Sequence, residues 1–139
     1  MSDITYEFVS AAPVEAIVEL YRSAGWWREN EASRAAIPAM IRGSFCFLVA
    51  KSPERDIVGM GRVLSDGASD AYIQDVAVLE RFRQRGIGRE IVRRLAERCR
   101  EARIGWIGLV AEPGTQEFYE PLGFHVVAGH QLMLHRSKE

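Results

Sequence analysis

A glycine-containing turn in the middle of the chain joins a predicted strand to a strongly amphipathic predicted helix. The strand is the apolar stretch 71–78, and the turn reads Arg83-Gln84-Arg85-Gly86-Ile87-Gly88. From Ile87 onward, apolar residues recur every three or four positions, which is the spacing of a helix that buries one face. The sequence therefore predicts a strand–turn–helix unit around which the remaining elements must be arranged.

The start of this predicted helix is suited to binding an anion. The first N–H groups of a helix have no partner within it, and they carry the positive end of the helix dipole. Gly86 and Gly88 lack the Cβ atoms that would hold a phosphate away from those amides. Four arginines flank the turn and could hold a further phosphate, namely Arg81, Arg83, Arg85 and Arg89. We expect a pyrophosphate to bind here.

Two common phosphate-binding loops do not fit the turn. A Walker loop needs Gly-Lys-Ser/Thr after its spacer, and the chain has no such sequence. A Rossmann fingerprint needs a third Gly or Ala, but Ile91 stands at that position. That fingerprint also belongs to the first strand of its domain, whereas this turn lies midway along the chain.

The turn instead resembles the Gln/Arg-x-x-Gly-x-Gly/Ala signature of the GNAT superfamily of acyl-CoA-dependent N-acyltransferases. The signature reads here Arg83-x-x-Gly86-x-Gly88, after a strand that ends Val-Ala-Val. Downstream, the stretch 117–124 resembles the Phe-Tyr-x-x-Leu-Gly-Phe segment of the same family. The interval between the two motifs leaves room for one helix and one strand, as in that family. In element order the resemblance covers residues 4–136.

The hydrophobic pattern predicts a single α/β domain over residues 1–139, since this length suits one domain and 47% of the residues are hydrophobic. The predicted order is β-α-α-β-β-β-α-β-α-β-β, with about seven strands and about four helices. The last two strands are predicted at 124–127 and 131–135. This is the element order of the GNAT fold, which implies a mixed, twisted sheet. The fourth and fifth strands should run parallel, because a helix crossover joins them.

Composition limits the remaining function classes. Net charge is −1, although nine arginines crowd the stretch 81–103. Cys46 and Cys99, without a signal peptide, predict reduced thiols in a cytoplasmic protein. No apolar run approaches the roughly 20 residues of a membrane span, so no membrane partner is expected. The histidines have spacings unlike common zinc sites, so no metal is expected either.

The resemblance implies acetyl-CoA as the cosubstrate. In the family, the fourth and fifth strands separate at their C-terminal ends and the pantetheine arm fills the gap. Glu112 stands where the family often has an Asn that bonds the pantetheine, so this residue departs from the family pattern. The resemblance implies that the main chain of Val76 and Val78 bonds the pantetheine, although both residues suit a plain core strand equally well. The expected cofactor-binding residues are Val76, Ala77, Val78, Arg83, Gln84, Arg85, Gly86, Ile87, Gly88, Arg89, Glu112 and Phe118.

Tyr119 is the predicted catalytic acid, because a phenol within hydrogen-bond reach can protonate a departing thiolate. The family places a tyrosine there for that role. The alternative is a core tyrosine packed beside phenylalanines. Asp75 is a candidate general base whose pKa burial could raise, or else it bonds a neighbouring loop. Glu112 is the second candidate base.

The expected reaction is direct acetyl transfer to a primary amine of a small molecule. Tyr21, Trp26 and Trp27 are expected to wall the acceptor site, and the stretch 75–124 looks most like the arylalkylamine branch of the family. Three alternatives stay open: acetylation of a protein amine, a catalytically weak acyl-CoA-binding module, and a nucleic-acid binder using the arginine-rich helix, which the acidic residues elsewhere disfavour. Edge strands near the C-terminus could pair two copies as a homodimer.

Overall fold

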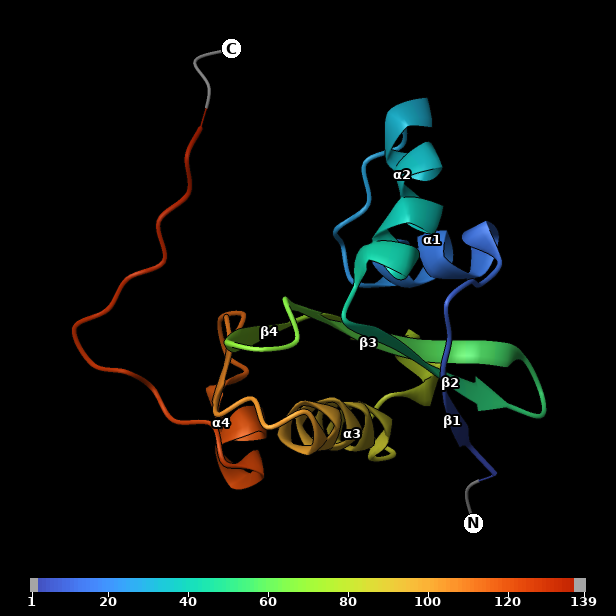
Figure 1. Cartoon of the computed structure of the whole chain (residues 1–139). Helices are drawn as coiled ribbons and strands as arrows, with labels where there is room; N and C mark the ends of the chain where they lie inside the picture. Colours follow the sequence, from blue (N-terminus) through green and yellow to red (C-terminus); the bar gives the residue numbers. More distant parts are fainter. Residues whose placement is uncertain (1–2, 137–139) are drawn as a thin grey trace.

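The computed structural model describes residues 3–136, which form one five-stranded sheet with helices on both faces (Figure 1). The strands are β1 (Thr5–Phe8), β2 (Cys46–Ser52), β3 (Asp56–Ser65), β4 (Asp70–Val78) and β5 (Trp106–Leu109). The helices are α1 (Val14–Ser23), α2 (Glu31–Gly43), α3 (Ile87–Glu101) and α4 (Gln116–Tyr119), with 3-10 turns at Glu80–Phe82 and Glu120–Leu122. The strands lie in sequence order, and only β4 and β5 pair in parallel.

The core lies on both faces of the sheet. Helices α1 and α2 cover one face and α3 covers the other (Figure 1). The α3 stripe predicted from the sequence is buried, with Ile91 and Leu95 fully inaccessible. A Cβ atom at Gly61 on β3 would lie 2.7 Å from Ile91 Cγ2 and 2.9 Å from Leu95 Cδ1. Glycine at this position therefore allows α3 to approach the sheet closely.

A β-bulge interrupts the pairing of β3 with β4. Met60 pairs with Ala77 and Arg62 pairs with Gln74, so two residues of β4 lie opposite the single residue between them on β3. One of the two, Asp75, has φ of 57°, in the left-handed region. Bulges of this kind redirect a side chain and are common beside functional sites. Here the bulge sets the direction of the Asp75 carboxylate.

The pairing of the parallel strands β4 and β5 ends before β4 does, in line with the separation that the family resemblance implies. Their pairing runs from Asp70 opposite Trp106 to Ile73 opposite Leu109, where β5 ends. Strand β4 continues to Val78 while still paired with β3 on its other side. Among the described residues, the 74–78 stretch therefore has no strand partner on the β5 side. Its main-chain groups on that side are available to a ligand, except that the Val78 carbonyl already accepts a hydrogen bond from Arg83 Nε.

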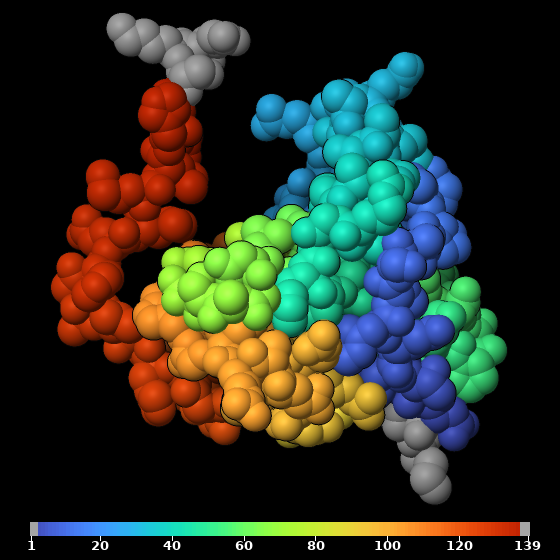
Figure 2. All heavy atoms as spheres, viewed as in Figure 1, coloured from blue at the N-terminus to red at the C-terminus, as the bar shows by residue number. Residues whose placement is uncertain are grey.

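The prediction of about seven strands is wrong for the C-terminus. Neither 124–127 nor 131–135 forms a strand in the described structure, and the segment 124–136 extends away from the sheet (Figures 1 and 2). The β5 strand has an open edge, but the segment does not lie along it, so among the described residues its N–H and C=O groups have no strand partner. The apolar pattern that predicted two strands is present, but the pairing is not.

Candidate active site

Two cavities meet beside the separated ends of β4 and β5. The larger, of about 670 Å³, follows the end of β4 and the start of α3. The smaller, of about 390 Å³, lies between β4, the segment after β5 and the loop that joins α1 to α2. Val76, Thr115 and Tyr119 line both cavities. A ligand in one cavity can therefore meet a ligand in the other beside Tyr119.

The larger cavity, called here the cradle, includes the start of α3. Gly86 precedes the helix with φ of 82°, in the left-handed region that glycine favours. The first intrahelical bond runs from the Glu90 N–H to the Gly86 carbonyl, at 3.1 Å. The N–H groups of Ile87, Gly88 and Arg89 consequently have no acceptor within the helix. The structure thus presents the free amides that the glycine turn predicts.

The arginines around the cradle have different roles. The Arg83 guanidinium donates to the Val78 carbonyl at 2.8 Å and to the Ser23 carbonyl at 3.0 Å, so it joins the end of β4 to α1. Arg85 donates to a carbonyl group of the preceding turn. The Arg89 side chain has neither a hydrogen bond nor an ion pair with any described residue, and it lines the cradle. Its guanidinium is therefore free to contact a phosphate.

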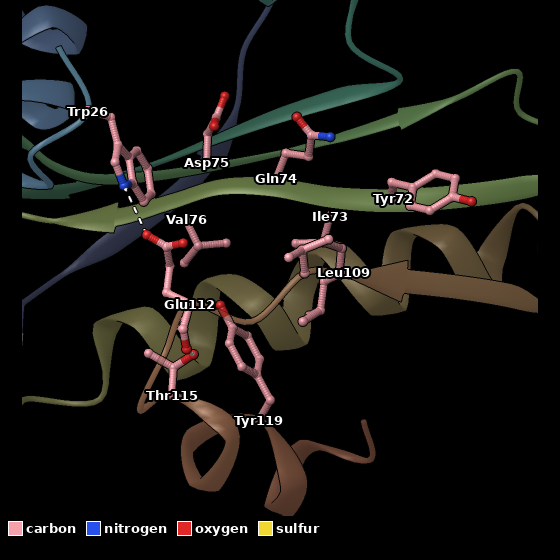
Figure 3. A pocket seen from close by; sticks show the side chains of 11 residues that line it. Trp26, Tyr72, Ile73, Gln74, Asp75, Val76, Leu109, Glu112, Thr115 and Tyr119 are labelled. Carbon is pink, nitrogen blue, oxygen red and sulfur yellow. Dashed lines mark hydrogen bonds between the residues drawn. The ribbon is translucent and has the colours of Figure 1, made fainter. Parts of the chain in front are cut away.

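Tyr119 lies where the two cavities join, and its hydroxyl points from α4 toward β4 (Figure 3). Its ring packs edge-on against Phe118, 4.9 Å away, and against Phe124, 6.1 Å away. Burial, and to a lesser degree the Glu112 carboxylate, raise the pKa of the Tyr119 phenol above its ordinary value. The packing and the chemical interpretations of this tyrosine are therefore compatible, because the ring is packed while the hydroxyl faces the cavities.

Glu112 lines the smaller cavity and not the cradle. Its carboxylate accepts a hydrogen bond from Trp26 Nε1 at 3.4 Å, which links the segment after β5 to the loop between α1 and α2 (Figure 3). The Thr115 hydroxyl donates to the Glu112 carbonyl at 2.6 Å and ties this segment to the start of α4. No cation among the described residues pairs with the Glu112 carboxylate. It is thus the unpaired negative group of the smaller cavity.

Of the aromatic residues expected to wall the acceptor site, only Trp26 lines the smaller cavity. Trp27 packs against Tyr21, with ring centroids 6.2 Å apart, and lies beneath the Arg34 guanidinium. Tyr72 on β4 was not predicted for this site, yet it lines the cavity. Residues of a strand alternate between the two faces of the sheet, and Tyr72 alternates with apolar neighbours along β4. That alternation was the available signal that its ring lies on the open face.

Asp75 lines the smaller cavity, but two neighbouring side chains already hold its carboxylate. It accepts hydrogen bonds from the Tyr21 hydroxyl at 2.8 Å and from Arg62 Nε at 2.8 Å. The side chains of Arg62 and Asp75 are only 13% and 22% exposed. Burial, together with the Asp75 carboxylate, raises the pKa of Tyr21. Arg62 was not among the predicted site residues, although an arginine within an apolar strand indicates a charged partner.

This ion pair predicts a coupled loss of stability. We expect Arg62→Met to lower the free energy of unfolding by about 2–3 kcal/mol, because the Asp75 carboxylate then stays part-buried without its cation. Asp75→Asn in the Arg62→Met background should cost much less than Asp75→Asn alone. Urea unfolding of the two single variants and the double variant measures this coupling. Additive losses would contradict it.

Two other classes of site have no support in the described part of the chain. No three His, Cys, Asp or Glu side chains within residues 3–136 come together to hold a metal ion. None of the helices in the same range is long and apolar enough to cross a bilayer.

Comparison with known proteins places this geometry in a family. Residues 11–124 match the acetyltransferase (GNAT) family. The chain is 36% identical over 74 residues to the uncharacterized N-acetyltransferase ycf52 of Pyropia yezoensis, covering 53% of this chain and 42% of that protein. It is also 36% identical over 74 residues to GCN5-related N-acetyltransferase 2, chloroplastic, of Arabidopsis thaliana, covering 53% of this chain and 29% of that protein. The matches thus span less than half of these relatives.

Solved structures show the same fold. A GNAT family acetyltransferase from Streptococcus pneumoniae TIGR4 superposes with a TM-score of 0.80 at 22% identity, over 98% of this chain and 99% of that chain. AAC(6')-Iy, in complex with the bisubstrate analogue CoA-S-monomethyl-acetylneamine, superposes with a TM-score of 0.76 at 15% identity, over 99% of both chains.

Proposed function

Because this chain belongs to the acetyltransferase (GNAT) family, we propose that it transfers the acetyl group of acetyl-CoA to a primary amine of a small molecule. The observation that carries this proposal is the meeting of the two cavities beside Tyr119, at the gap between β4 and β5. A donor in the cradle and an acceptor in the smaller cavity would be in contact there. This arrangement supports direct attack within a ternary complex.

The cradle residues suit the parts of coenzyme A. The main chain of Val76 and the N–H of Val78, on the unpaired side of β4, would bond the amides of the pantetheine arm, while the Val78 carbonyl accepts from Arg83. The N–H groups of Ile87, Gly88 and Arg89 would hold the diphosphate. When bound, acetyl-CoA supplies the activated acetyl group. Tyr119 would donate its phenolic proton to the thiolate that leaves when the amine takes the acetyl group.

We propose Glu112 rather than Asp75 as the group that accepts the proton of the amine. Asp75 already accepts hydrogen bonds from Arg62 and Tyr21, which satisfy one of its oxygens and neutralise its charge. Glu112 has only the Trp26 indole as a side-chain partner among the described residues. It lines the same cavity as Tyr119, so its carboxylate could reach an amine directly or through one water. Asp75 would then have a structural role, in which its carboxylate holds Tyr21 against β4 at the wall of the smaller cavity.

A Glu112→Gln variant tests this assignment. We expect kcat/KM for the amine to fall about tenfold, less than the usual 10²–10⁴ for a buried acid or base, because bulk water can partly replace an exposed carboxylate. The affinity for acetyl-CoA should stay unchanged. Glu117→Gln is the matched control, since Glu117 is exposed and lines neither cavity. An unchanged kcat/KM for Glu112→Gln would exclude Glu112 as the base.

The lining of the smaller cavity supports an amine that carries an aromatic or apolar group. The rings of Trp26, Tyr72 and Tyr119 lie around it, and the Glu112 carboxylate can attract an ammonium ion. Arylalkylamines combine these two features, and we propose them as the acceptor class.

The nucleic-acid alternative has weaker support than the two that use the coenzyme. A nucleic-acid binder would need free guanidinium groups along α3, but Arg93 and Arg94 both pair with Glu90, and Arg100 pairs with Glu97. A catalytically weak acyl-CoA-binding module would share the cradle and differ only in turnover.

A thiol-release assay with acetyl-CoA separates these alternatives. The acceptor panel contains arylalkylamines, polyamines, aminoglycosides, amino acids and peptide N-termini, and mass spectrometry verifies the acetylated product. We expect turnover with arylalkylamines. Tight coenzyme binding without thiol release across the panel would favour the binding module, and turnover of peptide N-termini alone would favour a protein acceptor.

A further inference from the structure

The loop 24–30, which joins α1 to α2, carries Trp26 to the smaller cavity. The Trp26 N–H donates to the Tyr21 carbonyl at 2.9 Å, and the rings of the two residues lie 6.3 Å apart. On its other side, the Trp26 indole donates to the Glu112 carboxylate at 3.4 Å (Figure 3). That bond is long and Trp26 is 40% exposed, so its own contacts hold the indole weakly. The position of Trp26 therefore depends on how the rest of the loop is held.

Glu29, at the other end of the same loop, joins the loop to both helices. Its carboxylate accepts hydrogen bonds from Arg22 of α1 at 2.7 Å, from Trp27 Nε1 at 3.0 Å, and from Arg34 of α2 at 3.2 Å to each oxygen. The bonds from Trp27 and Arg22 lower the pKa of Glu29, so the carboxylate stays ionised to lower pH than an ordinary glutamate. A single exposed ion pair stabilises little, but several donors on one carboxylate form a network that can hold a loop.

This network reaches Trp26 through the neighbouring rings. The Trp27 ring lies 6.2 Å from the Tyr21 ring, and the Tyr21 hydroxyl donates to Asp75 on β4. Tyr21 is thus fixed on the sheet, and Glu29 holds Trp27 against it. Because Trp26 and Trp27 are adjacent in the chain, fixing Trp27 also limits the positions that Trp26 can take.

We propose that Glu29 is a positioning residue of the acceptor site, which holds the loop 24–30 so that Trp26 stays in the smaller cavity beside Glu112. This inference rests on the proposed function, in which an acceptor amine in that cavity meets the Trp26 ring. Glu29 lines neither cavity, so it acts on the acceptor only through Trp26. The network therefore favours amines with an aromatic group, which the Trp26 ring can contact, over small aliphatic amines.

A Glu29→Gln variant tests this role, because the amide keeps the size of the side chain and removes the charge that pairs with both arginines. We expect KM for an arylalkylamine to rise about threefold to tenfold, with kcat and the affinity for acetyl-CoA nearly unchanged. KM for ethylamine should stay the same. Glu31→Gln is the matched control, since Glu31 is exposed at the start of α2 and its side chain has neither a hydrogen bond nor an ion pair with any described residue. An unchanged KM in Glu29→Gln, or an equal rise in Glu31→Gln, would overturn the proposal.

A double-variant cycle separates positioning from a general loss of structure. Trp26→Ala removes the ring through which Glu29 is proposed to act. In that background, Glu29→Gln should add little to the loss of kcat/KM for the arylalkylamine, because the two changes remove the same contact. Additive losses would show that Glu29 does not act through Trp26.

The indole N–H signals in a ¹H–¹⁵N correlation spectrum give a readout that does not depend on turnover. The chain has three tryptophans, and Trp26→Ala identifies the Trp26 signal. Glu29→Gln should move this signal although the two side chains share no hydrogen bond, and Glu31→Gln should not. If the signal moves but no amine is acetylated, the proposed function fails and the placement of Trp26 by Glu29 stands. If the enzyme is active and the signal does not move, the positioning role is wrong and the proposed function stands.

Discussion

A Tyr119→Phe variant should turn over about a hundredfold more slowly than the wild type while binding acetyl-CoA with the same affinity. The ring packs against Phe118 and Phe124, and phenylalanine preserves that packing. Only the hydroxyl at the junction of the cavities is lost. Transfer of a proton to the leaving group contributes about 10²–10⁴ to a rate, so its loss should appear in kcat.

The pH dependence makes this prediction specific. Burial and the Glu112 carboxylate raise the pKa of Tyr119, so the phenol keeps its proton to higher pH than an ordinary tyrosine. Activity should therefore persist at alkaline pH and fall as the pH rises through the raised pKa. In Glu112→Gln the contribution of the carboxylate disappears, and the alkaline limb should move to lower pH. In Tyr119→Phe this limb should vanish.

Steady-state kinetics of Tyr119→Phe between neutral and alkaline pH, with the preferred amine saturating, provides the measurement. Tyr72→Phe is the control, because Tyr72 lines the smaller cavity but lies on β4 and packs on Trp106. Full turnover by Tyr119→Phe with an unaltered pH profile would remove Tyr119 from the chemistry and leave it a packing residue.

A Gly88→Val variant should bind acetyl-CoA about tenfold to a hundredfold more weakly. The Cβ at this position meets only ordinary contacts, 3.5 Å from Phe118 Cζ, so the helix should fold normally. The added methyl groups would occupy the space in front of the free N–H groups at the start of α3. Loss of one hydrogen bond to a charged phosphate is worth about 1.5–3 kcal/mol, which gives the expected range.

Calorimetric titration with acetyl-CoA measures the change for Gly88→Val. Gly105→Val is the matched control, since a side chain there meets nothing within 4 Å and the residue lines neither cavity. If both variants bind like the wild type, the start of α3 does not hold the coenzyme.

The parts of the site that depend on local sequence could be predicted. The strand, the glycine turn and the start of α3 are contiguous, so their spacing alone indicates a helix that presents free amides. The parallel pairing of β4 and β5 follows from the crossover between them, and their separation was implied by the family resemblance. The position of Tyr119 at the junction of the cavities agrees with the short motif that carries it.

Contacts between distant residues could not be predicted from local patterns. Trp26 and Glu112 are 86 residues apart in sequence, and Tyr21 and Asp75 are 54 apart. Their meeting depends on how α1 lies on the sheet and on the bulge at Asp75, and neither leaves a local signal. The prediction of the last two strands was wrong for another reason. Their pattern is that of strands, but pairing also requires that the segment lie along a sheet edge, and here it extends away from the open edge of β5.

The most direct test of the central claim, that the cradle receives the diphosphate of coenzyme A, is calorimetry with acetyl-CoA and S-acetylpantetheine. Both ligands carry the same thioester and arm, but only acetyl-CoA has the diphosphate and the 3′-phosphoadenosine beyond it. Gly88→Val, which acts beside the diphosphate, therefore shows how much of the difference comes from that group. The account predicts that the wild type binds acetyl-CoA at least about a hundredfold more tightly, in line with two hydrogen bonds to a charged group, and that Gly88→Val removes most of this difference. Equal affinities for the two ligands, or no binding of either, would contradict it.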